Sequence, residues 1–183
     1  MLTIVAQLAA MLFESLDPLH KLPPASGRIL EAAAHLYNIG HYINDSGHHK
    51  HSLYLVMNTD MPGFSDREHQ SIANLCRYHR KSMPQARHLE FQKLEAEDRN
   101  AIVLLSPLLR LAVAFDQSQQ QKVDGLEAAI QDRAVEVRLI SDCDTDIEQW
   151  HASQVSGVFR EVYGRQLVIR AKRAGAFDFS NDS

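Results

Sequence analysis

The chain has 183 residues, of which 45% are hydrophobic and 23% charged, and its formal net charge at pH 7 is −4. This length allows one domain, or one larger and one smaller unit, and the composition is that of an ordinary soluble globular protein. The negative charge excludes a general nucleic-acid binder but allows a local basic patch, so we expect no DNA partner.

The cysteines and the apolar runs indicate the cellular compartment of the protein. Cys76 and Cys143 share no metal-ligand spacing, which is typical of reduced cysteines in the cytosol. The apolar start, residues 1–13, has no basic flank and does not resemble a secretory signal. The apolar run 101–115 contains a proline and an arginine and is too short to span a bilayer. We therefore predict a cytoplasmic protein without a membrane partner.

Apolar residues at helical spacing predict a series of helices in the first two thirds of the chain. These helices are expected at residues 2–16, 28–38, 51–58, 66–80 and 96–117. Ser26 is a plausible N-cap of the second helix, and Ser65 with Glu68 forms a capping box before the fourth. The helix over 96–117 is apolar nearly all round, which places it at the centre of the core.

The last third of the chain has a different pattern. Apolar residues alternate over 126–130 and again over 135–139, which predicts a β-hairpin turning at residues 131–133. A helix over 144–163, ended by Gly164, and a strand over 166–170 follow. The predicted fold is mostly α, with a helical domain (1–120), a small ββαβ α/β unit (121–172) and a flexible tail (173–183).

Histidines are concentrated between residues 31 and 52, where the predicted helix gives way to a loop. Four of them lie within eleven residues: His41, His48, His49 and His51. Histidine is the commonest metal ligand and titrates near neutral pH, so this stretch is the first candidate for chemistry. The alternative is a solvated polar loop after a core helix. Elsewhere we expect His35 and Trp150 in the core, and the following at the surface: His20, His69, His88 and His151.

Four sequence motifs resemble the C-terminal region of the exopolyphosphatase and guanosine pentaphosphate phosphatase (Ppx/GppA) family. They are SGHHKHS at 46–52, PGFS at 62–65, RYHRK at 77–81 and LLRLA at 108–112. The resemblance covers roughly residues 2–169. It implies that the helical domain is HD-like and is followed by the small α/β unit. In the family the catalytic machinery lies in N-terminal actin-like domains, which we expect this chain to lack.

The resemblance also raises the question of a metal site. HD-type phosphohydrolases hold a divalent metal between histidines and a carboxylate at the end of a core helix, and the metal activates water. Where that pattern has His-Asp, this sequence has Tyr37-Asn38, which are poor ligands for such a metal. Only His51, His79 and Asp116 remain of the degenerate site. We therefore expect no metal and no catalytic residue in this chain, leaving Mg²⁺ or Mn²⁺ to the full-length family or to an altered HD enzyme.

Basic residues accumulate after position 77, with Lys50 expected nearby. A solvated charged face would explain them. In a chain of negative net charge, however, such a cluster could hold a polyanion, because arginine and lysine pair with phosphate oxygens regardless of sequence. The predicted polyanion-binding residues are Lys50, Arg77, Arg80, Lys81, Arg87, His48 and His49.

The leading hypothesis is an accessory domain of a Ppx/GppA-type phosphatase. It would hold polyphosphate or guanosine tetra/pentaphosphate and mediate homodimerisation, while hydrolysis, which the resemblance implies for the full-length family, would need the N-terminal domains. One alternative is a stand-alone HD-type metal phosphohydrolase with an altered ligand set. A second is a purely structural dimerisation domain. Metal content separates the first alternative from the other two interpretations, and affinity for polyanions separates the accessory domain from the structural one.

Overall fold

The computed structural model describes residues 3–173. Its helices are α1 (Ile4–Ser15), α2 (Asp17–His20), α3 (Pro24–Leu36), the 3-10 helix η1 (Ile39–Tyr42), α4 (His48–Met57), α5 (Asp66–Tyr78), α6 (Leu89–Gln92), α7 (Ala96–Ala114), α8 (Asp146–Ser153) and α9 (Ser156–Tyr163). Its strands are β1 (Gly125–Ile130), β2 (Ala134–Ile140) and β3 (Gln166–Lys172). The predicted fold, mostly helical with a small α/β unit at the end, is confirmed.

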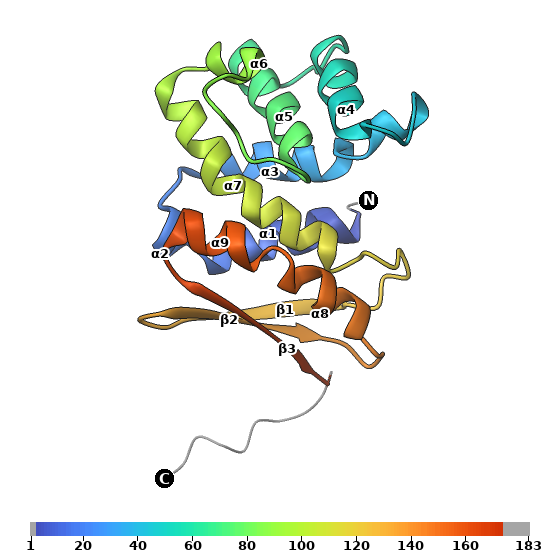
Figure 1. Cartoon of the computed structure of the whole chain (residues 1–183), viewed down its shortest axis with the longest axis vertical. Coiled ribbons are helices and arrows are strands. Elements are labelled where there is room, and N and C mark those ends of the chain that lie inside the picture. The colour runs from blue at the N-terminus through green and yellow to red at the C-terminus, as the bar shows by residue number, and fades with distance from the viewer. Residues whose placement is uncertain (1–2, 174–183) are drawn as a thin grey trace.

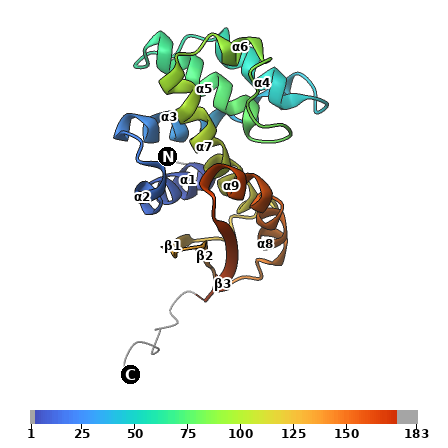
Figure 2. The same cartoon turned by 60° about the vertical axis from the view of Figure 1, so that its left-hand side comes forward.

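Helix α7 is the central element of the molecule. Figures 1 and 2 show the sheet at one end, beneath α1, α8 and α9, and the helices α4–α6 at the other end, with α7 reaching from one group to the other. Helix α7 contacts α1, α3, α5, α8 and α9. Its leucines at 105, 108, 109 and 111 are fully buried as a result. The prediction of a core helix here is confirmed, although the helix ends at Ala114.

The sheet has the order β1-β2-β3. Strand β2 pairs antiparallel with β1, with Leu126 opposite Leu139, and parallel with β3, with Val137 opposite Ile169. A parallel pair needs a crossover connection, which α8 and α9 supply. Side chains on the inner face of β2 are fully buried, whereas the outer face carries ion pairs such as Glu127–Lys172. The predicted hairpin and last strand are confirmed, and the predicted single helix is divided into α8 and α9.

Some predicted helix ends differ from the observed ones. The capping box is confirmed, since the Ser65 hydroxyl accepts from the Glu68 backbone N–H and the Glu68 carboxylate accepts from the Ser65 N–H. Ser26 is not a cap, because α3 already begins at Pro24. A proline is well tolerated at the first position of a helix, where the missing N–H costs no hydrogen bond. Helix α4 begins at His48, three residues before the predicted start.

Three burial predictions were wrong. Trp150 is 60% exposed, because α8 turns Glu148 and Ala152 toward the core and leaves Ile147 and Trp150 on its outer face. His20 is buried, since its ring stacks on Phe13 with centroids 4.4 Å apart and shares a 2.8 Å hydrogen bond with the Phe13 carbonyl oxygen. His35 is exposed on α3. Three histidines predicted at the surface are half-buried: His69, His88 and His151.

No helix within residues 3–173 is long and apolar enough to cross a membrane. The predicted tail, 173–183, lies outside the described residues except for Arg173. The predicted division at residue 120 stays a prediction.

A tight contact joins η1 to the start of α4. The Ser52 hydroxyl accepts a hydrogen bond from the Gly40 N–H at 3.0 Å and donates one to the Tyr37 carbonyl oxygen at 2.7 Å. A methyl group placed on Gly40 would overlap the His48 carbonyl oxygen and lie 2.6 Å from the Ser52 nitrogen. The backbone of η1 can therefore approach α4 this closely only with glycine at position 40.

Replacing Gly40 by alanine should destabilise the protein. The added methyl group would clash with backbone atoms, which cannot move aside as a flexible side chain can. We therefore expect the free energy of unfolding to fall by about 3 kcal/mol or more. For a chain of this size that corresponds to a fall in Tm of roughly 6–12 °C, measurable by thermal circular dichroism. Gly157→Ala is the matched control, because nothing lies within 4 Å of a methyl group at that helical position, and its Tm should not fall. A Tm for Gly40→Ala within about 2 °C of the wild type would contradict this account.

Candidate functional site

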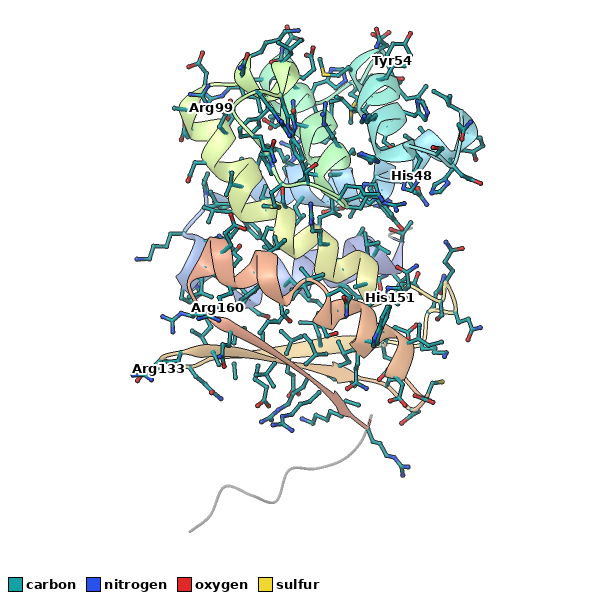
Figure 3. All side chains as sticks on the ribbon, in the orientation of Figure 1. His48, Tyr54, Arg99, Arg133, His151 and Arg160 are labelled. Carbon is teal, nitrogen blue, oxygen red and sulfur yellow. The ribbon has the colours of Figure 1, made fainter. Side chains whose placement is uncertain are left out.

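A cavity of about 840 Å³ opens between the η1–α4 region, the end of α5, the end of α7 and α8. Its polar lining includes Tyr37, His41, His48, His79, Arg80, Arg110, Asp116 and His151. Figure 3 shows two of these on the same side of the molecule, His48 on α4 and His151 on α8. Among the described residues that line this cavity, Asp116 is the only acid, whereas two are arginines. The cavity therefore favours an anion.

The cavity contains four of the five positions predicted for the degenerate HD site. Tyr37, Asn38, His79 and Asp116 line it. The Tyr37 ring meets the His79 ring edge-on, with centroids 5.0 Å apart. His51 does not line the cavity, and His48, one turn earlier on α4, lies there in its place.

These side chains do not form a metal site of the expected kind. Within residues 3–173 no group of three or more His, Cys, Asp and Glu side chains is arranged to hold a metal ion. The Arg80 guanidinium lies 3.4 Å from the ring nitrogens of His48, and its positive charge would oppose a cation there. The donor set present at the cavity does not suit Mg²⁺ or Mn²⁺.

His48 and His79 face each other through their Nε2 atoms, which are 3.2 Å apart. The Nδ1 atom of His79 lies 2.6 Å from the Cys76 carbonyl oxygen. A carbonyl oxygen only accepts, so His79 Nδ1 carries a proton and, in the neutral ring, its Nε2 is a bare acceptor. The hydrogen bond between the rings therefore runs from the Nε2–H of His48 to the Nε2 of His79.

Burial keeps these rings neutral in the free protein. Desolvation, with smaller contributions from the nearby His48 and Arg80, lowers the pKa of His79 to about 3. Burial also lowers the pKa of His48, with smaller contributions from His41 and Arg80 in the same direction. The pKa of His49 falls to about 4, first through burial and then through Arg80 and other cations. Near neutral pH the formal positive charge at this end of the cavity belongs to the arginines.

Four of the predicted basic residues lie near His49 or His88, and of these only Arg80 lines the cavity. Arg80, Lys50 and Arg77 are all close enough to lower the pKa of His49. Arg77, Arg87 and Lys50 do the same for His88. These four basic residues, Lys50, Arg77, Arg80 and Arg87, are called the basic cluster below. Lys81 is exposed and does not line the cavity.

Arg110 is a site residue that the sequence analysis did not select. Its Nε donates to the Tyr78 carbonyl oxygen at 2.8 Å, and its Nη2 donates to the carbonyl oxygens of Lys81 and Ser82 at 2.9 and 3.1 Å. Arg110 therefore ties the segment after α5, including Arg80, to α7. Burial lowers its pKa to about 10. The signal in the sequence was a single charge in the middle of an otherwise apolar helix, because such a charge is buried only when it has partners.

Asp116 makes the opposite end of the cavity acidic. Its Oδ1 accepts a hydrogen bond from the Gln121 N–H at 2.9 Å. Burial raises its pKa, and the carboxylate of Glu148 adds to that shift. Burial raises the pKa of Tyr37, and Asp116 raises it further, so the phenol stays protonated near neutral pH. The cavity thus has an arginine end near α5 and a carboxylate end near α8.

Comparison with known proteins identifies the family. Residues 3–152 match the family model described as Ppx/GppA phosphatase, domain III. The chain is 35% identical over 123 residues to guanosine-5'-triphosphate,3'-diphosphate pyrophosphatase of Pseudoalteromonas translucida (strain TAC 125). It is 28% identical over 121 residues to the protein of the same name from Vibrio vulnificus (strain YJ016). Each match covers 66% of this chain and 23% of the relative.

The chain belongs to the Ppx/GppA phosphatase family, since the family model matches more than half of its length. It spans about a quarter of the length of these two relatives. The resemblance expected from the sequence motifs is confirmed.

The neutral state of buried His79 predicts a pH dependence of stability. Its folded pKa is about 3, whereas an unfolded histidine has a pKa near 6.5. The unfolded chain therefore binds more protons below about pH 6.5, and stability falls as the pH falls. Lowering the pH from 8 to 5 should reduce the free energy of unfolding by about 2 kcal/mol through this residue. Denaturant unfolding at several pH values measures the loss.

In the variant His79→Gln the free energy of unfolding should change by about 2 kcal/mol less between pH 8 and 5 than in the wild type. The variant His35→Gln, at an exposed position, should keep the wild-type pH dependence. An NMR titration of the wild type gives an independent answer, because the His79 ring should remain neutral at pH 5. A His79 ring that becomes charged near pH 6.5 would contradict the prediction.

Proposed function

We propose that this domain is an accessory phosphate-binding module of a Ppx/GppA-type phosphatase. Its ligand is a polyanion, either polyphosphate or guanosine tetra/pentaphosphate. The observation that supports this most is the position of Arg80, an exposed arginine that lines the cavity and also belongs to the basic cluster. A chain of phosphates could enter the cavity at Arg80 and continue over Lys50 and Arg77.

The chemistry of the cluster suits a phosphate polyanion. Arginine presents several N–H donors in a planar fork, which match the oxygens of a phosphate group. The Arg80 guanidinium has only the 3.4 Å contacts to His48 among the hydrogen bonds of the described residues, so its remaining donors can turn to a ligand. The names of the two relatives support a guanosine polyphosphate as the substrate of the whole protein.

The other parts of the hypothesis stay proposals as well. A homodimer would give a role to Ile147 and Trp150, which are exposed one turn apart on α8. We also propose that the protein works in the cytoplasm and does not bind DNA. The alternative of an HD-type metal enzyme has less support, because the described residues offer no group of three metal ligands at the cavity.

Reversing two charges beside the cavity tests the proposal. Arg80→Glu with Lys81→Glu should weaken the binding of tripolyphosphate at least about tenfold, since each reversal replaces an attraction by a repulsion. Wild-type affinity should fall as salt rises from ~50 to ~300 mM, because binding releases counterions and salt screens the remaining contacts. Isothermal titration calorimetry measures both effects.

The matched control is Arg133→Glu with Arg160→Glu, which changes the net charge equally. Figure 3 shows Arg133 and Arg160 on the side of the molecule away from His48. This control should bind nearly as tightly as the wild type, and both double variants should keep the helical circular dichroism. Equal weakening by the two pairs would show that only net charge matters. Absence of binding by the wild type at low salt would leave the purely structural dimerisation domain as the better account.

A further inference from the structure

We propose that this site binds its phosphate ligand together with one proton, and that His48 is the residue that takes the proton up. The inference rests on the proposed function, since it describes what happens at the cavity when a phosphate group meets Arg80. The two ring nitrogens of His48 face different kinds of partner.

In the free protein His48 has to donate through Nε2. His79 holds its own proton on Nδ1 for the Cys76 carbonyl oxygen, which leaves its Nε2 as an acceptor 3.2 Å from the Nε2 of His48. A neutral His48 with its proton on Nε2 has a bare Nδ1. That bare nitrogen lies 3.1 Å from the Asp45 carbonyl oxygen, which is an unfavourable contact between two acceptors.

Arg80 offsets this contact when no ligand is present. Its Nη1 lies 3.4 Å from both ring nitrogens of His48, and because only Nδ1 lacks a proton in this tautomer, the contact is a weak hydrogen bond to Nδ1. The same positive charge also disfavours a proton on His48. Arg80 and the Asp45 carbonyl oxygen therefore act on His48 Nδ1 in opposite ways. Arg80 can donate to this nitrogen only when it carries no proton, whereas the carbonyl oxygen can accept from it only when it carries one.

A phosphate group changes this balance in one direction. If Arg80 turns its Nη1 from His48 to the phosphate oxygens, His48 Nδ1 loses its weak donor, and the phosphate neutralises the positive charge beside it. A proton from solvent can then bind to Nδ1 and form an N–H that donates to the Asp45 carbonyl oxygen. The resulting imidazolium has a partner at each nitrogen, Asp45 on one side and His79 on the other, and faces an anion.

Other titratable groups around His48 also affect whether it takes up a proton. His41 stacks on the His48 ring with centroids 3.8 Å apart, and its Nδ1 pairs with the Asp45 carboxylate. Asp45 favours a proton on His48, whereas His41 opposes it. His49 lies edge-on to His48 and is kept neutral by burial and by Arg80. More distant members of the cavity are Arg110 and Asp116 on α7, Tyr37 after α3 and His151 on α8.

The test observes the imidazole nitrogens directly. Protein with ¹⁵N-labelled histidine is titrated with tripolyphosphate near pH 7, and long-range ¹H–¹⁵N spectra report which nitrogens carry protons. In the free protein we expect the Nδ1–H form for His79 and the Nε2–H form for His48. With ligand bound, His48 should carry protons on both nitrogens. His35, exposed on α3 and outside the cavity, is the internal control and should not change.

Calorimetry in buffers of different ionisation enthalpy counts the protons taken up. The wild type should take up as much as one proton per ligand, and affinity should rise by up to about tenfold for each unit that the pH falls. The ligand itself tends to release protons on binding, because nearby cations favour the ionised phosphate, and this release reduces the net uptake. His48→Gln should abolish the uptake even if it weakens binding only modestly.

The outcomes separate the two proposals. Tripolyphosphate that binds while His48 stays neutral would overturn the proton uptake and leave the proposed function intact. A free protein in which His48 already carries its proton on Nδ1 would also overturn it. Absence of tripolyphosphate binding in the wild type would overturn the proposed function and this inference together. A doubly protonated His48 that appears only with ligand would support both.

Discussion

The close approach of η1 to α4 is the constraint on which the candidate site depends. Gly40 lets two backbone segments meet with no side chain between them, and the Ser52 hydroxyl ties both the Gly40 N–H and the Tyr37 carbonyl oxygen to α4. This contact holds the beginning of α4, and with it His48, against the end of α5, where the His48 and His79 rings meet. A bulkier residue at position 40 would separate these segments, and the histidine pair would lose its geometry even if every side chain in the cavity were unchanged.

Helix α7 provides the second support, because it carries both ends of the cavity. Arg110 donates to three carbonyl oxygens, one at the end of α5 and two in the segment after it, and so fixes the backbone on either side of Arg80. Asp116, just beyond the end of the same helix, faces the α/β unit. Pro107, one turn before Arg110, interrupts the hydrogen bonds of α7, and the Tyr163 hydroxyl donates to the Leu104 carbonyl oxygen near that point. Helices α8 and α9 also pack on α7, and residues of the α8 region line one side of the cavity.

The sequence predicted the elements well wherever a local rule decides the outcome. The capping box at Ser65, the hairpin around residues 131–133 and the apolar core helix depend on neighbours in the chain, and all three are present. The site was harder to predict, because which of His48 and His51 reaches the cavity depends on where α4 begins. The position of α4 in turn depends on contacts such as that between Gly40 and Ser52, which are twelve residues apart in the chain. Trp150, His20 and His35 were misplaced for a similar reason, since an apolar or polar neighbourhood in sequence does not fix which face of a helix meets the core.

We propose above all that a phosphate polyanion occupies the cavity at its arginine end. A crystal structure of the protein with tripolyphosphate tests this most directly. We predict phosphate density within hydrogen-bond distance of the Arg80 guanidinium, with the Arg80 contact to His48 Nδ1 broken and the His48–His79 contact kept. Density found only at surface positions away from Arg80, with the cavity side chains unchanged, would contradict the account.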